Sequence, residues 1–200
     1  PLNYDLPASF SDFIIGSFAA KIADKYEQVI WGGVNGNAGE FDGFCPLLLA
    51  DGGVDVAATP VTAANCIAEL QKVTAAIPAS IYNSEDLHIY VGSAIYRFYV
   101  QALGVVGAGS GIENKGTLWF NGTPLTADGV KIFYSPGMPA NSMVAAEVSN
   151  LYFGCGLESD FNEIRLIDMA EIDGSQNVRF IQRWKAGIQY GIRQDIILYQ

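Results

Sequence analysis

Residues 177–193 read Asn-Val-Arg-Phe-Ile-Gln-Arg-Trp-Lys-Ala-Gly-Ile-Gln-Tyr-Gly-Ile-Arg, and apolar side chains recur there at nearly every second position. A period of two is typical of a strand with one buried face. Residues 163–172 form the predicted partner strand, and residues 173–176 supply the turn between them. At about 3.3 Å per residue the second strand would be on the order of 50 Å long, against roughly 17–20 Å for an ordinary strand. The pattern therefore predicts an elongated antiparallel ribbon that leaves much surface for neighbouring molecules.

One face of this predicted strand is basic, because it carries Arg179, Arg183, Lys185 and Arg193. Two interpretations stay open. The face is either exposed to solvent and balanced by acidic residues of the partner strand, or it forms a row of ion pairs with a neighbouring subunit.

Residues 7–31 form the clearest predicted helix, since apolar residues recur there at steps of three and four. The pair Gly32-Gly33 ends it. At 1.5 Å per residue the helix is a rod of roughly 34 Å. A single apolar stripe on so long a rod needs a long partner, so we expect it to pack along the ribbon at 163–193.

The sequence pattern between the rod and the ribbon predicts a smaller mixed α/β unit. We therefore expect the chain as a whole to belong to the α+β class. Residues 34–59 are rich in Gly, Asn and Asp and predict a long connection with one short strand at 44–50. Residues 104–115 contain four glycines and predict a loop. Periodicity and breakers predict helices at 62–77 and 93–103, and strands at 87–91, 130–134, 143–148 and 150–153.

Composition excludes some classes of protein. Of the 200 residues, 50% are hydrophobic and 16% charged, as in a globular protein, and the formal net charge is −10. So acidic a chain is not expected to wrap nucleic acid, because phosphate contacts need Lys and Arg. Cys45, Cys66 and Cys155 include no C-x-x-C pair, which favours free thiols in a reducing compartment. A membrane-spanning helix needs about 20 consecutive apolar residues, and every apolar run in this sequence is shorter.

No motif in the sequence assigns a catalytic, cofactor-binding or metal site, and we expect none. His88, the only histidine, lies in a predicted strand without a G-x-S-x-G motif, which favours a structural role. The glycines of 104–111 match neither phosphate-binding pattern, since Ile112 interrupts G-x-G-x-x-G. Residues 51–55 lack the spacing of a calcium loop and predict a solvated turn.

Three segments, in this order, resemble the major capsid protein of tailed bacteriophages, which has the Hong Kong 97-type fold. The rod from Phe18 to Gly33 with its Gly-rich exit looks like the spine helix of that family. Residues 87–96, with the following helix and Gly-rich loop, resemble the axial subdomain. Residues 173–190 resemble the long strand of the peripheral subdomain. The resemblance covers nearly the whole chain.

The resemblance implies a peripheral subdomain from residues 1–45 and 156–200 and an axial subdomain from residues 46–155. It implies a non-enzymatic shell subunit that forms hexamers and pentamers with copies of itself. With other virion proteins, the subunits would enclose double-stranded DNA without sequence-specific binding, in a virion assembled in the bacterial cytoplasm. Only a few residues precede the rod, where the family has an N-terminal arm and an extended hairpin loop, so we expect a truncated or processed chain.

The resemblance also places subunit contacts. The Gly-rich loop would lie near a fivefold or sixfold axis, where small residues let several copies approach closely. Its contact residues would be Gly104, Gly107, Gly109, Gly111, Ile112 and Lys115. The rod and ribbon would line contacts between neighbours, and Gly187→Val is expected to damage folding or assembly where a neighbouring backbone packs close.

Three alternatives stay open. An encapsulin-like compartment shares the fold but holds enzyme cargo. A small hydrolase would need an exposed His88 beside a Ser or Asp. A carbohydrate- or receptor-binding module would show a concave cluster of exposed Trp31, Trp119 or Trp184.

Overall fold

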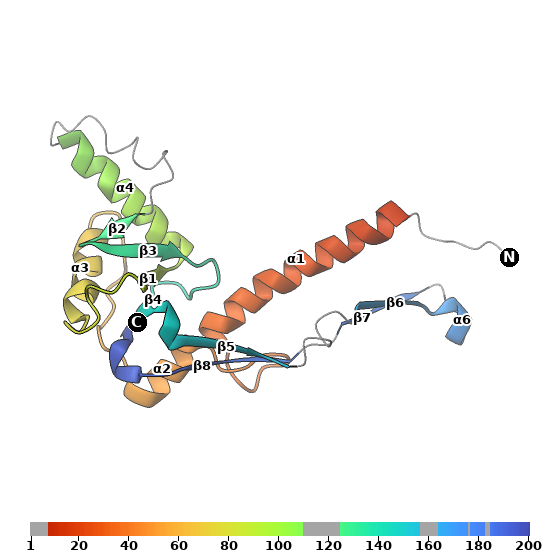
Figure 1. The fold of residues 1–200 in the computed structure, drawn as a ribbon. Helices are drawn as coiled ribbons and strands as arrows, with labels where there is room; N and C mark the ends of the chain where they lie inside the picture. Colours follow the sequence, from red (N-terminus) through yellow and green to blue (C-terminus); the bar gives the residue numbers. More distant parts are fainter. Residues whose placement is uncertain (1–7, 110–124, 157–163, 176, 183–184) are drawn as a thin grey trace.

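The computed structural model describes residues 8–109, 125–156, 164–175, 177–182 and 185–200. It has a globular part built around a mixed sheet, from which a long helix and a thin β arm extend to the same side (Figure 1). Within the described ranges, no helix is long and apolar enough to cross a membrane.

The globular part is organised by a five-stranded sheet in the order β2-β3-β1-β4-β9. The central strand β1 runs parallel to β3 and antiparallel to β4, and β4 pairs with β9 at the C-terminal end of the chain. The strands are β1 Leu87–Val91, β2 Thr126–Ala127, β3 Val130–Tyr134, β4 Met143–Glu147 and β9 Ile197–Tyr199.

Both faces of the sheet are covered, because successive residues of a strand point to opposite faces. Ile89 and Val91 of β1 face a core closed by α3 (Cys66–Ala76) and α4 (Ser93–Gly109). Tyr90 faces a second core. That core is closed by α2 (Phe44–Gly52) and the end of α1 (Ala8–Gly32).

The arm consists of two ribbons of two strands each. β5 (Leu151–Cys155) pairs with β8 (Ala186–Tyr190), and β6 (Ile164–Asp168) pairs with β7 (Val178–Gln182). A helical turn, α6 (Ala170–Asp173), lies between β6 and β7, and Gly174 ends it with a φ of 71°, a conformation that favours glycine. In its described residues the arm is therefore a thin structure, in which each ribbon is only two strands wide.

The prediction of one unbroken strand over 177–193 is wrong. β7 and β8 are separate strands with different partners, and the predicted partner, 163–172, pairs with β7 alone. The reason is that β6 begins only at Ile164, which pairs with Gln182 at the end of β7, so the next strand, β8, pairs with β5 instead. Arg193 lies beyond the ribbon, in the short 3₁₀ turn Arg193–Asp195.

Two further predictions are wrong in the globular part. Residues 44–50 belong to helix α2, in which Phe44, Cys45 and Leu48 are buried; a short apolar run does not by itself distinguish a strand from a buried helix. Residues 104–109 continue helix α4 instead of opening a loop, since glycine costs only about 1 kcal/mol in a helix and does not end it. Gly104, Gly107 and Gly109 therefore lie on α4, while Gly111, Ile112 and Lys115 lie outside the described residues.

The other elements are confirmed. The helices expected at 7–31 and 62–77 are α1 and α3, and the four strands expected in the middle of the chain are β1, β3, β4 and β5. The division at residues 45 and 155 stays a prediction. β9, which that division assigns to the periphery, pairs with β4 in the five-stranded sheet.

Candidate subunit-contact surfaces

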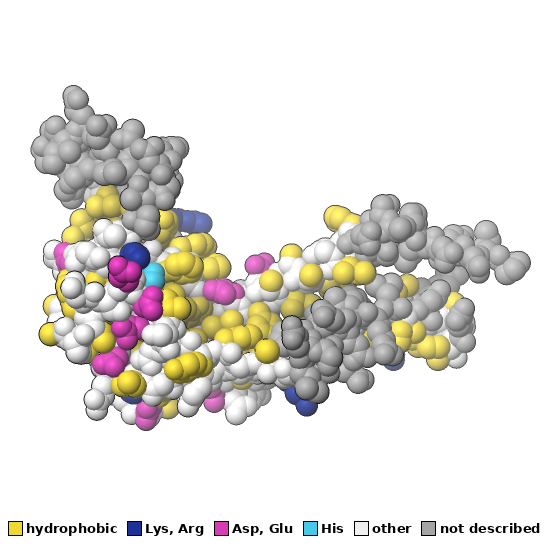
Figure 2. All heavy atoms as spheres, viewed as in Figure 1, with side chains coloured by type: hydrophobic (Ala, Val, Ile, Leu, Met, Phe, Trp, Pro, Cys, Tyr) yellow, Lys and Arg dark blue, Asp and Glu magenta, His cyan; other side chains and the backbone are white. Residues whose placement is uncertain are grey.

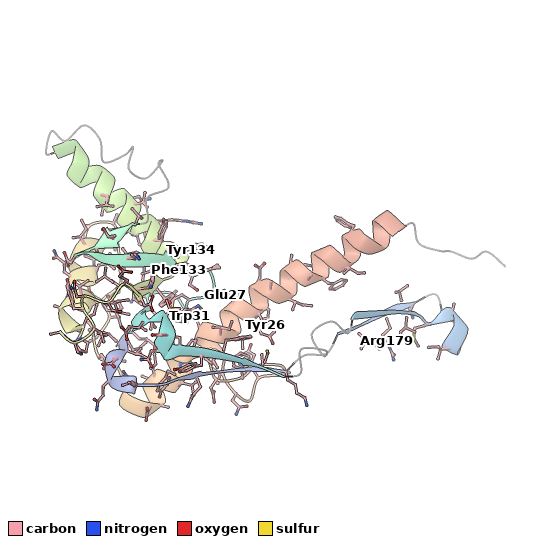
Figure 3. All side chains as sticks on the ribbon, viewed as in Figure 1. Tyr26, Glu27, Trp31, Phe133, Tyr134 and Arg179 are labelled. Atoms are coloured by element: carbon pink, nitrogen blue, oxygen red, sulfur yellow. The ribbon has the colours of Figure 1, made fainter. Side chains whose placement is uncertain are left out.

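The long helix is fixed to the globular part by aromatic packing at its C-terminal end. Trp31 is buried between Phe44 of α2 and Tyr90 of β1, with ring centroids 5.5 Å and 5.0 Å away. Figure 3 shows Trp31 and Glu27 on the last turns of α1, where it meets the sheet. Since three elements supply these rings, their packing sets the direction in which α1 leaves the globular part.

A hydrogen bond and a glycine complete this joint. The hydroxyl of Ser135 donates to Glu27 Oε1 at 2.6 Å, and Trp31 Nε1 donates to the same oxygen at 3.4 Å. Gly137 lies against the backbone of Glu27, where a Cβ atom would come within 2.2 Å of the carbonyl group. Only glycine fits at that distance, so the segment after β3 packs directly against the backbone of α1.

Sequence reasoning missed this joint. Glu27 and Ser135 are 108 residues apart, and neither lies in a motif that predicts the pairing. The available signal was the glycines that follow the rod. A Cβ atom at Gly43 would come within 2.7 Å of the backbone of Trp31 and Val29, which indicates a close crossing of chains there.

The N-terminal half of α1 projects away from the globular part. Phe13 is 72% exposed and Phe18 is 44% exposed. Nearer the joint, Tyr26 packs edge-on against Phe153 of β5 at 6.3 Å and against Phe41 at 6.5 Å. The expectation that the rod packs along the ribbon therefore holds for its C-terminal half. Figure 2 shows that hydrophobic side chains also lie on the surface of α1.

A hollow of about 440 Å³ lies between α1, residues 39–41 and the start of β8. Its apolar lining includes Phe18, Ile22 and Tyr26, and its basic lining is Lys21, Lys25 and Lys185. Lys25 forms an ion pair with Glu40, and this hydrogen bond, with others from Asn37 and the backbone of Val34, lowers the pKa of Glu40 to about 2. The wall at 34–40 is thus held in place by a carboxylate that stays ionised.

The proximal ribbon, β5 with β8, exposes large apolar side chains. Tyr152 is 57% exposed and Phe153 is 51% exposed. Gly154 and Gly187 lie directly opposite one another, and a Cβ atom at Gly187 would meet nothing within 4 Å. The ribbon thus has a bare stretch of backbone that no described part of this chain approaches.

The four basic residues predicted to line the ribbon have different positions. Arg179 is exposed on β7, far along the arm (Figure 3), and Lys185 is exposed just before β8. Neither forms an ion pair with another described residue. Arg183 lies outside the described residues.

Arg193 binds within its own chain. Its guanidinium donates to Asp55 Oδ2 at 3.0 Å, to the carbonyl of Gly53 at 3.0 Å and to the carbonyl of Ile196 at 2.7 Å. It therefore fixes the C-terminal segment to the loop after α2, and it does not share a strand face with Arg179. Asp51 accepts a hydrogen bond from Tyr190 at 2.6 Å, so the segment 51–55 does more than turn in solvent.

Among the described residues of the globular part, one charged side chain is buried. Glu69 of α3 accepts hydrogen bonds from Tyr199 at 2.8 Å and from Lys72 at 2.8 Å. Burial raises the pKa of Glu69, but these hydrogen bonds outweigh it and the net pKa is lowered. Burial, together with the hydrogen bond to Glu69, raises the pKa of Tyr199 to about 12. The pair joins α3 to β9 inside the core.

His88 lies half-buried on β1. Its Nδ1 atom is 2.7 Å from the carbonyl oxygen of Asp86, and its ring meets Phe133 edge-on at 6.4 Å. Among the described residues no serine or aspartate side chain hydrogen-bonds to this ring, so the geometry adds nothing to the hydrolase interpretation.

The remaining sequence predictions concern the tryptophans, the cysteines and possible metal ligands. Trp31 is buried, while Trp119 and Trp184 lie outside the described residues. The cysteines are free thiols, as predicted, with Cys45 and Cys66 buried and Cys155 exposed. The part of the chain that the structure describes contains no group of three or more His, Cys, Asp or Glu residues placed to hold a metal ion.

Comparison with known proteins gives an informative similarity among solved structures. No family model matches the sequence, and no curated protein matches it. The fold is similar to that of a chain in the solved structure described as "Satellite phage P4 procapsid including size determination (Sid) protein", with a TM-score of 0.63 and 12% sequence identity. The match covers 97% of this chain and 64% of that chain. At this identity it shows the fold alone: this α+β chain has a phage-capsid-type fold.

Proposed function

We propose that this protein is a structural, non-enzymatic subunit of a bacteriophage icosahedral capsid with a Hong Kong 97-like fold. In this proposal it assembles with copies of itself into hexamers and pentamers, which enclose double-stranded DNA together with other virion proteins. The observation that carries the proposal is the similarity of 97% of the chain to a chain in a phage procapsid.

The exposed apolar surface of the arm supports self-assembly. A monomeric protein rarely leaves large apolar side chains exposed together, and such surface usually marks an interface. Two of these side chains lie on the proximal ribbon, and others lie on α1 and at the distal end of the arm: Phe13, Phe18, Ile172 and Val178. Copies of this chain would cover them.

The end of α4 suits contacts around a symmetry axis. Figure 1 shows α4 extending beyond the sheet, away from the arm. Three of the last six residues of the helix are Gly104, Gly107 and Gly109. Without side chains at these positions, several copies can approach one axis closely. We propose the same role for Gly111, Ile112 and Lys115, which follow in sequence.

The charge of the chain fits a container better than a DNA-binding protein. With a formal net charge of −10, the protein repels phosphate on average, so packaged DNA would be enclosed without tight or sequence-specific binding. Arg179, Arg183 and Lys185 would form ion pairs with neighbouring subunits. The product would be located in the virion after assembly in the bacterial cytoplasm.

Electron microscopy of the complete gene product, combined with sedimentation velocity, tests this proposal. We expect closed particles, or hexameric and pentameric rings, when the protein is expressed with its neighbouring genes. A preparation that stays monomeric over the whole accessible concentration range would contradict it. Turnover of a test ester by that monomer would favour the hydrolase alternative.

A further inference from the structure

We propose that the outer edge of β5 pairs with the β5 edge of a second copy of this chain, antiparallel and around a twofold axis at Phe153. This inference rests on the shell-subunit role proposed above and names one contact within it. It follows from three observations: outward-pointing backbone groups on β5, an exposed segment without charge in an acidic chain, and an aromatic side chain two positions from a glycine.

One edge of the proximal ribbon has unpaired backbone groups. In an antiparallel pair, the N–H and C=O groups of alternate residues point toward the partner strand, and those of the other residues point away. The N–H of Gly156 donates to the carbonyl of Lys185 at 2.9 Å, which fixes this alternation along β5. The backbone groups of Phe153 and Cys155 therefore point outward, and no described residue hydrogen-bonds to them.

The segment around β5 lacks the features that usually protect an exposed edge. Soluble proteins cover such edges or place charged residues and proline on them, because an open apolar edge pairs with other strands. Residues 148–156 contain no charged residue and no proline, in a chain whose formal net charge is −10. Residues 152–156 are all exposed. Two acidic copies repel each other on average, so an uncharged strand is where they can approach with the least repulsion.

The opposite edge of the ribbon, on β8, is less suited to pairing. Lys185 is exposed at one end of β8, and a charged residue at an edge discourages strand addition. At the other end the hydroxyl of Tyr190 donates to Asp51 of α2 at 2.6 Å, so this helix lies beside the strand. The β5 edge is therefore the more open of the two.

The sequence of β5 is complementary to itself in one register. With the twofold axis at Phe153, this residue exchanges both backbone hydrogen bonds with its copy, and the N–H of Cys155 donates to the carbonyl of the partner's Leu151. Tyr152 then lies opposite the partner's Gly154 in a pair without hydrogen bonds, where the Cα atoms are only about 4.5 Å apart. An aromatic side chain opposite a glycine of an edge strand stabilises a sheet by covering the bare backbone.

The glycines of the ribbon leave room for this tyrosine. Gly154 and Gly187 lie opposite one another, on the same face as Tyr152. A Cβ atom at Gly154 would have only the carbonyl oxygen of Gly187 within 4 Å, at 3.7 Å. In the proposed register each Tyr152 covers the bare stretch of the other copy. The contact also joins two ribbons of two strands into one sheet of four, which is more stable than two strands alone.

The symmetry of the contact determines its place in a shell. Both copies contribute the same surface, so the contact is isologous and closes after two copies. It cannot build a ring of five or six subunits by itself. In the proposed shell it would join subunits of neighbouring rings.

Mixed single-cysteine variants test the register. In a Cys155→Ser background, in which Cys45 and Cys66 are buried, Tyr152→Cys is mixed with Gly154→Cys in the full chain under mild oxidation. Their Cα atoms would be about 4.5 Å apart, within the range of a disulfide. We expect a cross-linked dimer in the mixture and at least tenfold less in either variant alone, because neither position lies opposite itself. No cross-link in the mixture, or equal cross-linking in all three samples, would overturn the proposal.

A pair of proline variants tests the backbone hydrogen bonds. Cys155→Pro removes an N–H group that points out of the ribbon, so the ribbon itself loses no hydrogen bond. Ala186→Pro is the matched control, because Ala186 lies opposite Cys155 and its N–H group points out of the other edge. Sedimentation velocity should show association weakened at least tenfold by the first variant and less than about twofold by the second. Equal association of the two variants would refute the edge pairing.

The two proposals fail separately. Closed particles without the selective cross-link between positions 152 and 154 would reject the edge pairing and leave the shell role intact. The selective cross-link in a protein that never forms rings or particles would support the edge pairing and reject the shell role.

Discussion

The globular part and the arm bury apolar residues in opposite ways. In the globular part, helices cover both faces of the sheet, and Ile89, Val144 and Leu198 are completely buried. In the arm, two ribbons of two strands leave Tyr152 and Phe153 more than half exposed. An isolated two-stranded ribbon is marginally stable in water. The contrast teaches that one part of this chain carries its own core, while the other depends on contacts beyond itself.

Mutation of the core should give the largest loss of stability. Leu48→Ala removes a side chain that is 0% exposed and leaves a cavity beside Trp31 and Phe44. We expect the free energy of unfolding to fall by about 2–5 kcal/mol, measured by urea denaturation. Leu49→Ala, on the same helix but 45% exposed, is the matched control and should cost less than about 1.5 kcal/mol. Similar losses in both variants would mean that α2 does not close a core.

The joint between the two regions should be the next most sensitive place. Gly137→Ala would bring a Cβ atom within 2.2 Å of the Glu27 backbone, so either α1 or the segment after β3 must move. We expect a loss of about 1–3 kcal/mol in unfolding free energy, as for other overpacking substitutions. Gly16→Ala, at an open position of the same helix, should be neutral or stabilising by up to about 1 kcal/mol. Thermal unfolding of the two variants measures the difference, and equal melting temperatures would contradict a tight joint.

Raising the pH above 10 should lower the stability of the globular part by a smaller amount, through Tyr199. The pKa of Tyr199 is raised from 10.0 to about 12 in the folded state, so its phenol ionises more easily after unfolding. Stability from this group is therefore complete below pH 10 and is lost as the pH rises toward 12. Tyr199→Phe should reduce the loss of stability over that range. Urea unfolding at pH 9 and pH 11 measures it, and an unchanged pH dependence would show that Tyr199 is not the group responsible.

The same contrast explains how much could be predicted from sequence. The strands β1 and β3 were predicted at their observed residues, because alternation and neighbouring turns are local signals. Pairing in the arm is not local. The sequence of residues 186–190 does not show that their partner is β5. A period of two is equally compatible with β5 and with the partner segment predicted from sequence, residues 163–172.

The contact surfaces were predicted least well. The basic row was inferred from alternation, which cannot show that Arg193 leaves the strand and binds Asp55. The hydrogen bond between Glu27 and Ser135 joins residues that are 108 positions apart, and no repeating sequence pattern indicates it. The hollow needs the helix, residues 39–41 and β8 together, so it exists only in three dimensions.

Gly187→Val should have the smallest effect on the isolated chain and therefore tests the contrast most sharply. A Cβ atom at Gly187 meets nothing within 4 Å, and valine favours strands, so unfolding free energy should change by less than about 0.5 kcal/mol. Assembly should nevertheless decrease, because a branched side chain on the bare Gly154–Gly187 stretch would keep a neighbouring backbone away. Sedimentation velocity of the variant beside the parent protein measures assembly, and urea unfolding measures stability. If the variant assembles normally, the bare stretch faces solvent in the particle; if it unfolds more easily, the arm contains packing that belongs to the chain itself.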